Sequence, residues 1–259
     1  MNLGIEGRTA IVCGSSQGLG YACAEALSRE GVRVILNGRD VAKLEKSAAT
    51  LREATGGEVI PVAADISTRE GRERLVAAAP NADILINNNG GPKPGTFLDH
   101  DEATWMEAIE ANMVAPLMLT RALLPGMKER HFGRIINITS AMVTTPRPHM
   151  TLSAGTRAGL TAAMKALALD AVRYNVTINN LLPERFDTDR QHQMARAAMV
   201  RENISYEEAR KRQVESIAAK RLGDPKEFGA TCAFLCSAYA GYMSGLNIHL
   251  DGGSYPALI

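Results

Sequence analysis

The glycines Gly14, Gly18 and Gly20 are spaced in a way that suits the binding of a dinucleotide phosphate. They follow a short apolar run, residues 8–13, and lead into a helical pattern, and dinucleotide sites use this order of strand, loop and helix. Glycine permits a tight turn and a close backbone approach, while the helix N-terminus offers free N–H groups to phosphate oxygens. The loop therefore predicts a cofactor site formed by Gly14, Ser16, Gln17, Gly18, Leu19 and Gly20.

An arginine, rather than an acid, follows the second apolar run, which covers residues 32–36. Sites selective for NAD usually place a carboxylate here for the ribose 2′-hydroxyl, whereas arginine suits a 2′-phosphate. The alternative is that Arg39 lies in a solvated turn and is neutralised by Asp40. We expect NADP(H) to be preferred over NAD(H), with Asn37 and Arg39 among its contacts.

Seven short apolar runs alternate with helical patterns along the chain. Several are apolar at consecutive positions, which is typical of parallel strands buried on both faces. The pattern predicts an α/β fold: a single-domain doubly wound (Rossmann) parallel sheet of about seven strands, with helices on both faces, over residues 1–259. The expected strands are residues 8–13, 32–36, 58–63, 84–87, 134–139, 177–181 and 246–250.

Further motifs occur in the order of one known family. The chain resembles the classical short-chain dehydrogenases/reductases, nearest in pattern to the 3-oxoacyl-acyl-carrier-protein reductases, from about residue 5 to residue 253. The motifs besides the glycine loop are Asp65-Ile66, Asn87-Asn88-Asn89-Gly90, Asn112, the segment 136–140, the segment 183–188, Arg221-Leu222-Gly223-Asp224-Pro225 and Asp251-Gly252-Gly253.

The resemblance implies which of these residues contact the cofactor. It places Asp65 and Ile66 beside the adenine of the cofactor. It places Asn88 and Gly90 along the cofactor, and Asn89 lies between them at a position where the family usually has Ala. By the same resemblance, three residues near the sixth strand are expected beside the nicotinamide: Pro183, Phe186 and Thr188.

The family's catalytic pattern is altered in this chain. The family uses Asn, Ser, Tyr and Lys, and here Asn112 and Ser140 match the first two, while Ser153 and Arg157 stand at the Tyr and Lys positions. Arginine keeps its proton near neutral pH and serine is a poor acid, so the family's proton transfer is not available. Losing a positioned general acid typically costs about 10²–10⁴ in rate. We expect Ser140, Ser153 and Arg157 to form an oxyanion pocket, with Asn112 as the fourth candidate catalytic residue. Arg157 can also bind ribose hydroxyls of the cofactor, as the resemblance implies for the family's Lys.

Other polar residues near this pocket leave the proton donor open. Glu184 stands where the family has Gly, Arg185 follows it, and His149 precedes Ser153 by four residues. Glu184 and Arg185 pairing with each other at the surface is the alternative to a catalytic role. The candidates for a replacement acid are a water molecule, His149, His192, Tyr206 and Glu184.

Residues 186–221 form an insertion between the last two strands. Between 190 and 212 basic residues outnumber acidic ones by six to three. This predicts either a substrate lid over an anionic group or a solvated helical pair capped at Ser205. A proline at position 116, inside a long helical pattern at 99–129, predicts a kink.

Composition narrows the class of protein. With 29 basic and 28 acidic residues in 259, the net charge is +1, so we expect no nucleic-acid partner. Residues 228–250 carry no formal charge, but they include too many polar residues for a membrane span. The four cysteines form neither a disulfide framework nor a metal motif, although Cys232 and Cys236 are four residues apart. We expect a cytoplasmic homo-oligomer, a tetramer or a dimer, formed through helices near 101–129 and 153–174.

Three functions follow from these observations. The first is an NADP(H)-dependent oxidoreductase of atypical mechanism that acts on a small carbonyl or alcohol substrate. The second is a catalytically impaired NADP-binding sensor or scaffold. The third is a lyase or isomerase that uses the same pocket without hydride transfer.

Overall fold

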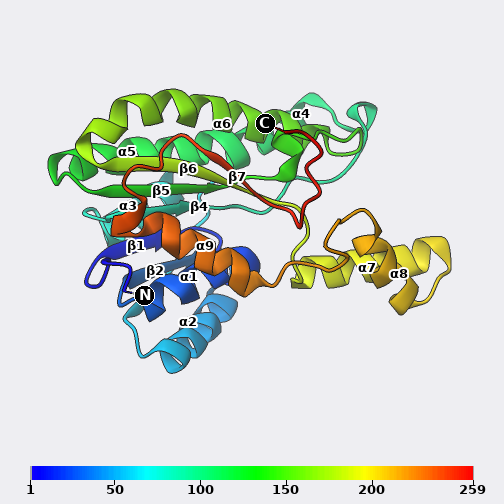
Figure 1. Cartoon of the computed structure of the whole chain (residues 1–259), viewed down its shortest axis with the longest axis horizontal. Coiled ribbons are helices and arrows are strands. Elements are labelled where there is room, and N and C mark those ends of the chain that lie inside the picture. Colours follow the sequence, from blue (N-terminus) through cyan, green and yellow to red (C-terminus); the bar gives the residue numbers. More distant parts are fainter. Residues whose placement is uncertain (1, 259) are drawn as a thin grey trace.

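A seven-stranded parallel sheet forms the centre of the molecule (Figure 1). The structure is a computed structural model that describes residues 2–258. The strand order is β3-β2-β1-β4-β5-β6-β7, so the direction of winding reverses between β1 and β4, where ligands of such sheets bind. All seven predicted strands are confirmed: β1 (Thr9–Val12), β2 (Arg33–Gly38), β3 (Val59–Ala63), β4 (Ile84–Asn87), β5 (Gly133–Ile138), β6 (Val176–Pro183) and β7 (Asn247–Leu250).

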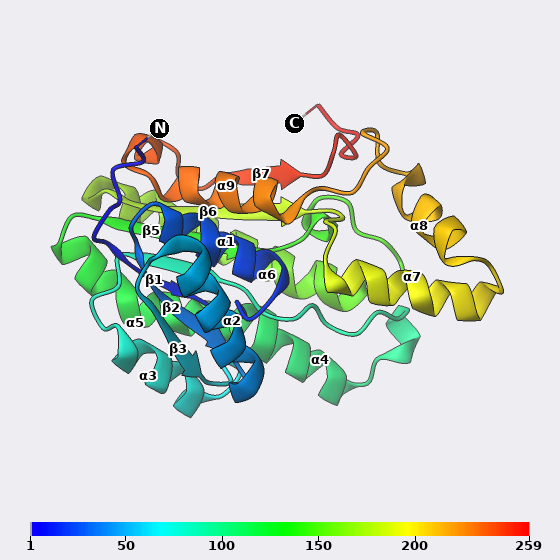
Figure 2. The same ribbon diagram turned by 90° about the horizontal axis from the view of Figure 1, so that it is seen from below.

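Helices cover both faces of the sheet, and each face has its own apolar core (Figures 1 and 2). One core lies under α1 (Gly18–Arg29), α2 (Val41–Thr55) and α9 (Pro225–Cys236). The other lies under α3 (Arg69–Ala78), α5 (Ala115–Glu129) and α6 (Thr151–Ala171). Because one sheet supplies both cores, the chain folds as the single doubly wound domain that the sequence predicts.

The proline at position 116 accompanies a π-helical turn. Between α4 (Glu102–Ile109) and α5 the segment Glu110–Val114 is π-helical. Pro116 has no N–H to donate to the carbonyl of Asn112, so the regular α-helical hydrogen-bond pattern is interrupted at this point. The turn contains the buried residue Asn112.

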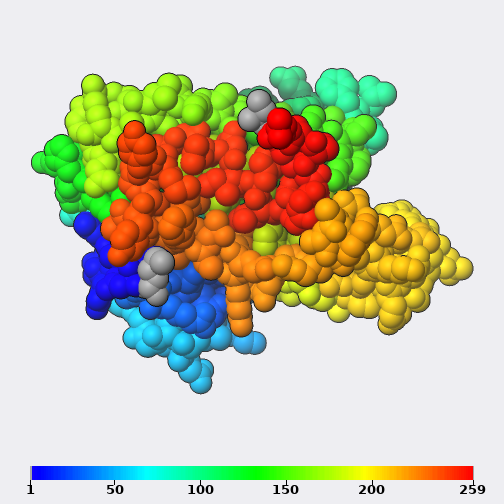
Figure 3. All heavy atoms as spheres, viewed as in Figure 1, coloured from blue at the N-terminus to red at the C-terminus, as the bar shows by residue number. Residues whose placement is uncertain are grey.

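Two helices extend away from the body of the molecule. α7 (Asp189–Glu202) and α8 (Tyr206–Glu215) project beyond the sheet in Figure 1 and form a separate lobe in Figure 3. Ser205 caps α8 by accepting a hydrogen bond from the Glu208 N–H at 3.1 Å, as predicted. At the base, Asp187 binds Arg210 at 2.6 Å. The predicted 186–221 insertion is therefore a helical pair, here called the α7–α8 lobe.

The segment 228–250 divides among α9, a short 3₁₀ turn and β7. Within residues 2–258 no helix is both long enough and apolar enough to cross a bilayer. Cys232 and Cys236 on α9 are completely buried beside Cys23 of α1, and burial raises the pKa of Cys236 well above its usual value. In the same described part of the chain, no cluster of His, Cys, Asp and Glu side chains could hold a metal ion.

Four asparagine side chains form a hydrogen-bonded row across the sheet interior. Asn87 donates to Asn137 at 2.9 Å, Asn137 to Asn180 at 2.9 Å, and Asn180 to Asn247 at 2.8 Å. These residues are partners in the parallel register of β4 to β7. Each inner amide satisfies its neighbour, so the row fixes the relative position of four strands.

Replacing the middle of this row is expected to be costly. Asn137→Leu leaves the Asn180 oxygen without its donor and weakens the pairing of Asn87, so the free energy of unfolding falls by about 2–3 kcal/mol. Asn247→Leu, at the exposed end of the row, is the matched control and loses less. Urea denaturation followed by circular dichroism measures both, and equal losses would contradict the row as a stabilising unit.

Candidate active site

The glycine loop lies at the carboxyl end of β1 and leads directly into α1. Gly14 and Gly18 have φ values of 54° and 62°, in the left-handed region that glycine adopts readily. A Cβ on Gly20 would lie 2.5 Å from the Gly14 carbonyl oxygen, so the loop packs on the helix too closely for any side chain. Gln17, the residue before α1, makes no side-chain cap. The first N–H groups of α1 are thus available to an anion.

The side chains of Asn37 and Asn88 bind the backbone of this loop at Gly14. The Asn37 oxygen accepts from the Gly14 N–H at 3.3 Å, and its amide donates to the carbonyls of Val62 and Ala64, both at 3.1 Å. The Asn88 amide donates to the Gly14 carbonyl at 3.0 Å. The structure therefore brings both predicted residues to the loop, where their side chains position its backbone.

The end of β2 carries positive charge. Arg39 is exposed and forms no ion pair within residues 2–258. Asp40 caps α2 instead, accepting from the Lys43 N–H at 2.9 Å, so it does not neutralise Arg39. The Lys43 ammonium donates to Gln17 of the glycine loop. Lys43 was not predicted from the sequence, although its position one turn after Arg39 places it at the same edge.

The residues after β3 and β4 line the next part of this edge. Asp65 accepts from the Ser67 N–H at 2.9 Å, and Ile66 is buried in the core under α3 and α5. The Asn89 amide donates to the Ala111 carbonyl at 3.1 Å, and its oxygen accepts from the Gly90 N–H at 2.8 Å. Asn89 thereby ties the loop after β4 to the π-helical turn.

Arg157 is a buried cation without a carboxylate partner. Its side chain comes from α6, the residue is only 7% exposed, and Nη1 donates to the carbonyls of Ile138 at 2.7 Å and Thr139 at 2.9 Å. Its Nε is buried and has no hydrogen-bond partner among residues 2–258. Burial, and secondarily the charge of Arg190, lowers the pKa of Arg157 to about 10, so the group stays charged at neutral pH.

The other candidate catalytic residues lie on the elements next to this cation. Ser140 directly follows Thr139, and its Oγ accepts from the Met142 N–H at 3.2 Å. Ser153 lies one turn before Arg157 on α6 and is 3% exposed, and its hydroxyl forms no hydrogen bond within the described chain. Asn112 donates to the Ala108 carbonyl at 3.3 Å, while its oxygen is buried without a partner. Its π-helical turn packs against α6.

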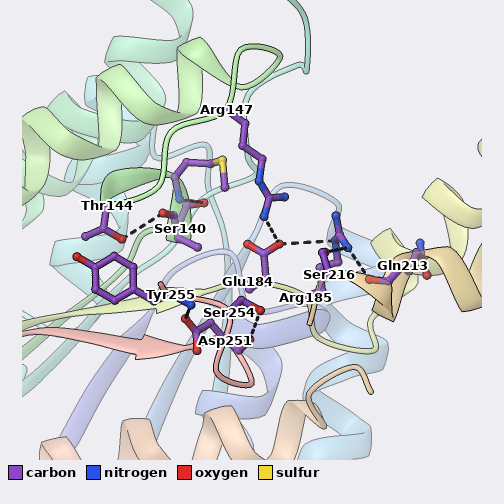
Figure 4. Close-up of polar contacts among 12 residues, drawn as sticks. Ser140, Thr144, Arg147, Glu184, Arg185, Gln213, Ser216, Asp251, Ser254 and Tyr255 are labelled. Carbon is purple, nitrogen blue, oxygen red and sulfur yellow. Dashed lines mark hydrogen bonds and ion pairs between the residues drawn. The ribbon is translucent and has the colours of Figure 1, made fainter. Parts of the chain in front are cut away.

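Glu184 lies between two arginines rather than at the surface (Figure 4). Its side chain is 5% exposed, and its Oε1 lies 2.9 Å from Nη2 of Arg147 and 3.7 Å from Nε of Arg185. Arg185 also donates to the Gln213 carbonyl at the end of α8, and burial lowers the pKa of Arg185. Of the alternative interpretation, a surface pair of Glu184 with Arg185, the pairing is present but the surface position is not, and Arg147, 37 residues away, is the nearer partner.

The residues after β6 separate into two groups. Thr188 lies against the glycine loop, with its methyl 3.9 Å from where a Gly18 Cβ would be. Phe186 turns into the core, where its ring packs edge-on against Phe228 with ring centroids 5.2 Å apart. Pro183 is the last residue of β6, at the edge where β1 and β4 also end.

The proposed replacement acids do not gather at one point. His192 and Tyr206 bind each other at 2.7 Å within the α7–α8 lobe, and Glu184 is committed to its two arginines. His149 is exposed, and its carbonyl accepts from the Gly95 N–H at 3.0 Å. The C-terminal segment adds Tyr255, which stacks on His249 with ring centroids 4.1 Å apart and whose N–H binds Asp251 (Figure 4).

Comparison with known proteins agrees with this geometry. The family model described as short chain dehydrogenase matches residues 8–198. The chain belongs to the short-chain dehydrogenase family. By family it is an oxidoreductase, and the strand order and glycine loop described above are those of a dinucleotide-binding fold.

Relatives of this short-chain dehydrogenase cover nearly its whole length. An uncharacterized oxidoreductase of Bacillus subtilis, YvaG, is 32% identical over 98% of both chains. The 3-oxoacyl-[acyl-carrier-protein] reductase FabG of Vibrio cholerae is 30% identical over 98% of this chain and 99% of its own. Among solved structures, the L-sorbose reductase of Gluconobacter frateurii complexed with NADPH and L-sorbose has a TM-score of 0.95, with 31% identity and complete coverage of both chains.

The position of Glu184 predicts a measurable stability effect. Glu184→Ala leaves two partly buried guanidinium groups unpaired and close to each other, so the free energy of unfolding falls by about 1–3 kcal/mol. The matched control is Glu73→Ala, which removes an exposed ion pair with Arg69. The Glu73 side chain is 62% exposed and the Arg69 side chain 81% exposed. This control changes stability little. Equal urea midpoints for the two variants would show that the buried pair contributes nothing.

Proposed function

We propose that this short-chain dehydrogenase is an NADP(H)-dependent oxidoreductase of atypical mechanism that acts on a small carbonyl or alcohol substrate. The carrying observation is the N-terminus of α1 after the glycine loop, which has no side-chain cap, together with two cations, Arg39 after β2 and Lys43 in the first turn of α2. The one carboxylate between them, Asp40, is committed to the cap of α2. The NADPH-bound L-sorbose reductase of the same fold supports this choice of cofactor.

The residues present fit such a cofactor. The free N–H groups at the start of α1 suit the diphosphate, and the two cations after β2 suit the 2′-phosphate. The buried Asn112 oxygen and Arg157 Nε, both without partners, are a polar acceptor and a charged donor for ligand groups. When bound, NADP(H) supplies or accepts the hydride.

Ser140, Ser153 and Arg157 would act on the substrate oxygen. We place Ser153 and Arg157 where the family carries its Tyr and Lys. The unpartnered Ser153 hydroxyl is free to donate a hydrogen bond to a carbonyl oxygen. The fixed charge of Arg157, bonded to the carbonyl next to Ser140, stabilises negative charge developing there. Without a strong acid, the proton on oxygen comes from water or a neighbouring group at a cost of about 10²–10⁴ in rate.

The assembly and location of the protein are part of the same proposal. α4 and α6 retain large exposed apolar residues, among them Met106 at 58% and Leu169 at 71% exposure. Other apolar residues of α6, such as Leu160 and Met164, are used in the monomer's own core. We propose a cytoplasmic homo-oligomer, a tetramer or a dimer, that covers the exposed residues.

The preference for NADP(H) is tested by titration. The wild-type chain is expected to bind NADPH at least tenfold more tightly than NADH, as measured by nicotinamide fluorescence. Arg39→Ala removes one contact to the 2′-phosphate, so the Kd for NADPH rises about tenfold or more while the Kd for NADH changes little. Failure of the wild-type chain to bind either nucleotide would overturn both the oxidoreductase proposal and a sensor role.

The role of the pocket is tested by two variants. With NADPH and activated ketones, Ser140→Ala is expected to lower kcat/KM by about 10²–10³, as for a lost oxyanion donor, without changing the Kd for NADPH. The double variant Ser153→Tyr, Arg157→Lys restores the family's acid–base pair and is expected to raise kcat. Activity only in the double variant would instead favour an NADP-binding sensor or scaffold. Product formation without a change in nicotinamide absorbance would favour a lyase or isomerase.

A further inference from the structure

Arg190 is a cation that the protein itself does not neutralise. It is an exposed residue in the first turn of α7, and its side chain forms neither an ion pair nor a hydrogen bond within residues 2–258. Of its acidic neighbours in sequence, Asp187 binds Arg210 at 2.6 Å and His192 at 3.4 Å, and no ion pair joins Arg190 to Asp189. A positive charge at a helix N-terminus also opposes the helix dipole, so this placement does not stabilise α7.

The side chain of Arg190 nevertheless has a defined place. Its Nη1 lies 2.6 Å from the point where a Cβ on Gly91 would be, so the guanidinium rests directly on the loop after β4. Thr188, two residues earlier, rests on the glycine loop after β1. Arg190 therefore reaches from the α7–α8 lobe toward the β1–β4 junction, where the winding of the sheet reverses.

Arg157 provides a second observation at the neighbouring strand end. It donates to the carbonyls of Ile138 and Thr139 at the end of β5, which pairs with β4, and Arg190 rests on the loop after β4. Arg157 is more than nine-tenths buried, has no carboxylate partner, and keeps a buried Nε without any hydrogen-bond acceptor. The charge of Arg190 lies close enough to lower the pKa of Arg157. Two like charges with unused donors raise each other's free energy unless an anion lies between them.

We propose that Arg190, delivered by the α7–α8 lobe, forms an anion site that binds the diphosphate of the dinucleotide, and that the buried charge of Arg157 adds to the positive field there without contacting the diphosphate. This rests on the proposed function. We prefer the diphosphate to a substrate carboxylate as the anion because Arg190 contacts the loop after β4 and Thr188 contacts the glycine loop. The free N–H groups of α1 lie at that same glycine loop. Guanidinium groups bind phosphate oxygens in a bidentate manner.

The site is tested with binary complexes that contain no substrate. Arg190→Gln is expected to raise the Kd for NADPH and for NADH by the same factor, about tenfold to a hundredfold, because both nucleotides carry the diphosphate. Arg190→Lys recovers part of the loss. Inorganic pyrophosphate should displace NADPH from the wild-type chain more effectively than from Arg190→Gln, at concentrations scaled to each Kd.

The controls separate the possible outcomes. Arg196→Gln removes another exposed arginine of α7 that has no ion pair in the described chain, and it should leave both Kd values unchanged. Equal thermal midpoints show that all variants fold.

If wild type and Arg196→Gln bind NADPH, and Arg190→Gln binds it equally well, the site is overturned while the proposed function stands. A loss that appears only in the KM of anionic substrates assigns Arg190 to the substrate and also overturns the site. If wild type binds neither nucleotide, both proposals fail.

Discussion

The buried guanidinium of Arg157 is the interaction on which the candidate site depends. It fastens α6 to the carboxyl end of β5 through the carbonyls of Ile138 and Thr139. This contact fixes Ser153, one turn earlier on the helix, relative to Ser140, the residue after the strand. Two carbonyl dipoles offset only part of the cost of burying a cation, so the folded chain retains a site that favours negative charge.

The chain is nearly neutral as a whole, but positive charge is in excess at one edge of the sheet. The chain has a net charge of +1, yet Arg39, Arg157 and Arg190 lie along one edge of the sheet without acidic partners. The fold causes this because the carboxyl ends of all seven parallel strands meet at that edge, and the loops there come from distant parts of the sequence. A net charge close to zero therefore says nothing about the sign of the charge at one edge of the sheet.

The strands could be predicted because burial on both faces leaves a clear apolar signal, and β4 agrees to the residue. Side-chain partners could not be predicted, since several compete for each group. The Asp40 carboxylate could have paired with the adjacent Arg39. Instead it caps α2, because the Lys43 backbone N–H that it accepts from is already held in place by the helix. Glu184 had Arg185 adjacent but binds mainly Arg147, which only the meeting of the β5 and β6 ends brings near. Pro116 indicated an interruption, but not that it takes the form of a π-helical turn, which packs against α6.

Under the proposed function, an arginine at position 157 gives up proton transfer for firmer positioning. A lysine ammonium can release its proton when its pKa is lowered, whereas a guanidinium with a pKa of about 10 keeps its charge at neutral pH. The planar group can bond two strand carbonyls through one nitrogen and still present Nε to a ligand. The site therefore retains charge stabilisation and cofactor positioning while losing its own acid. Turnover should then be fastest for carbonyl groups that are already strongly polarised, because these need the least help from a proton at the transition state.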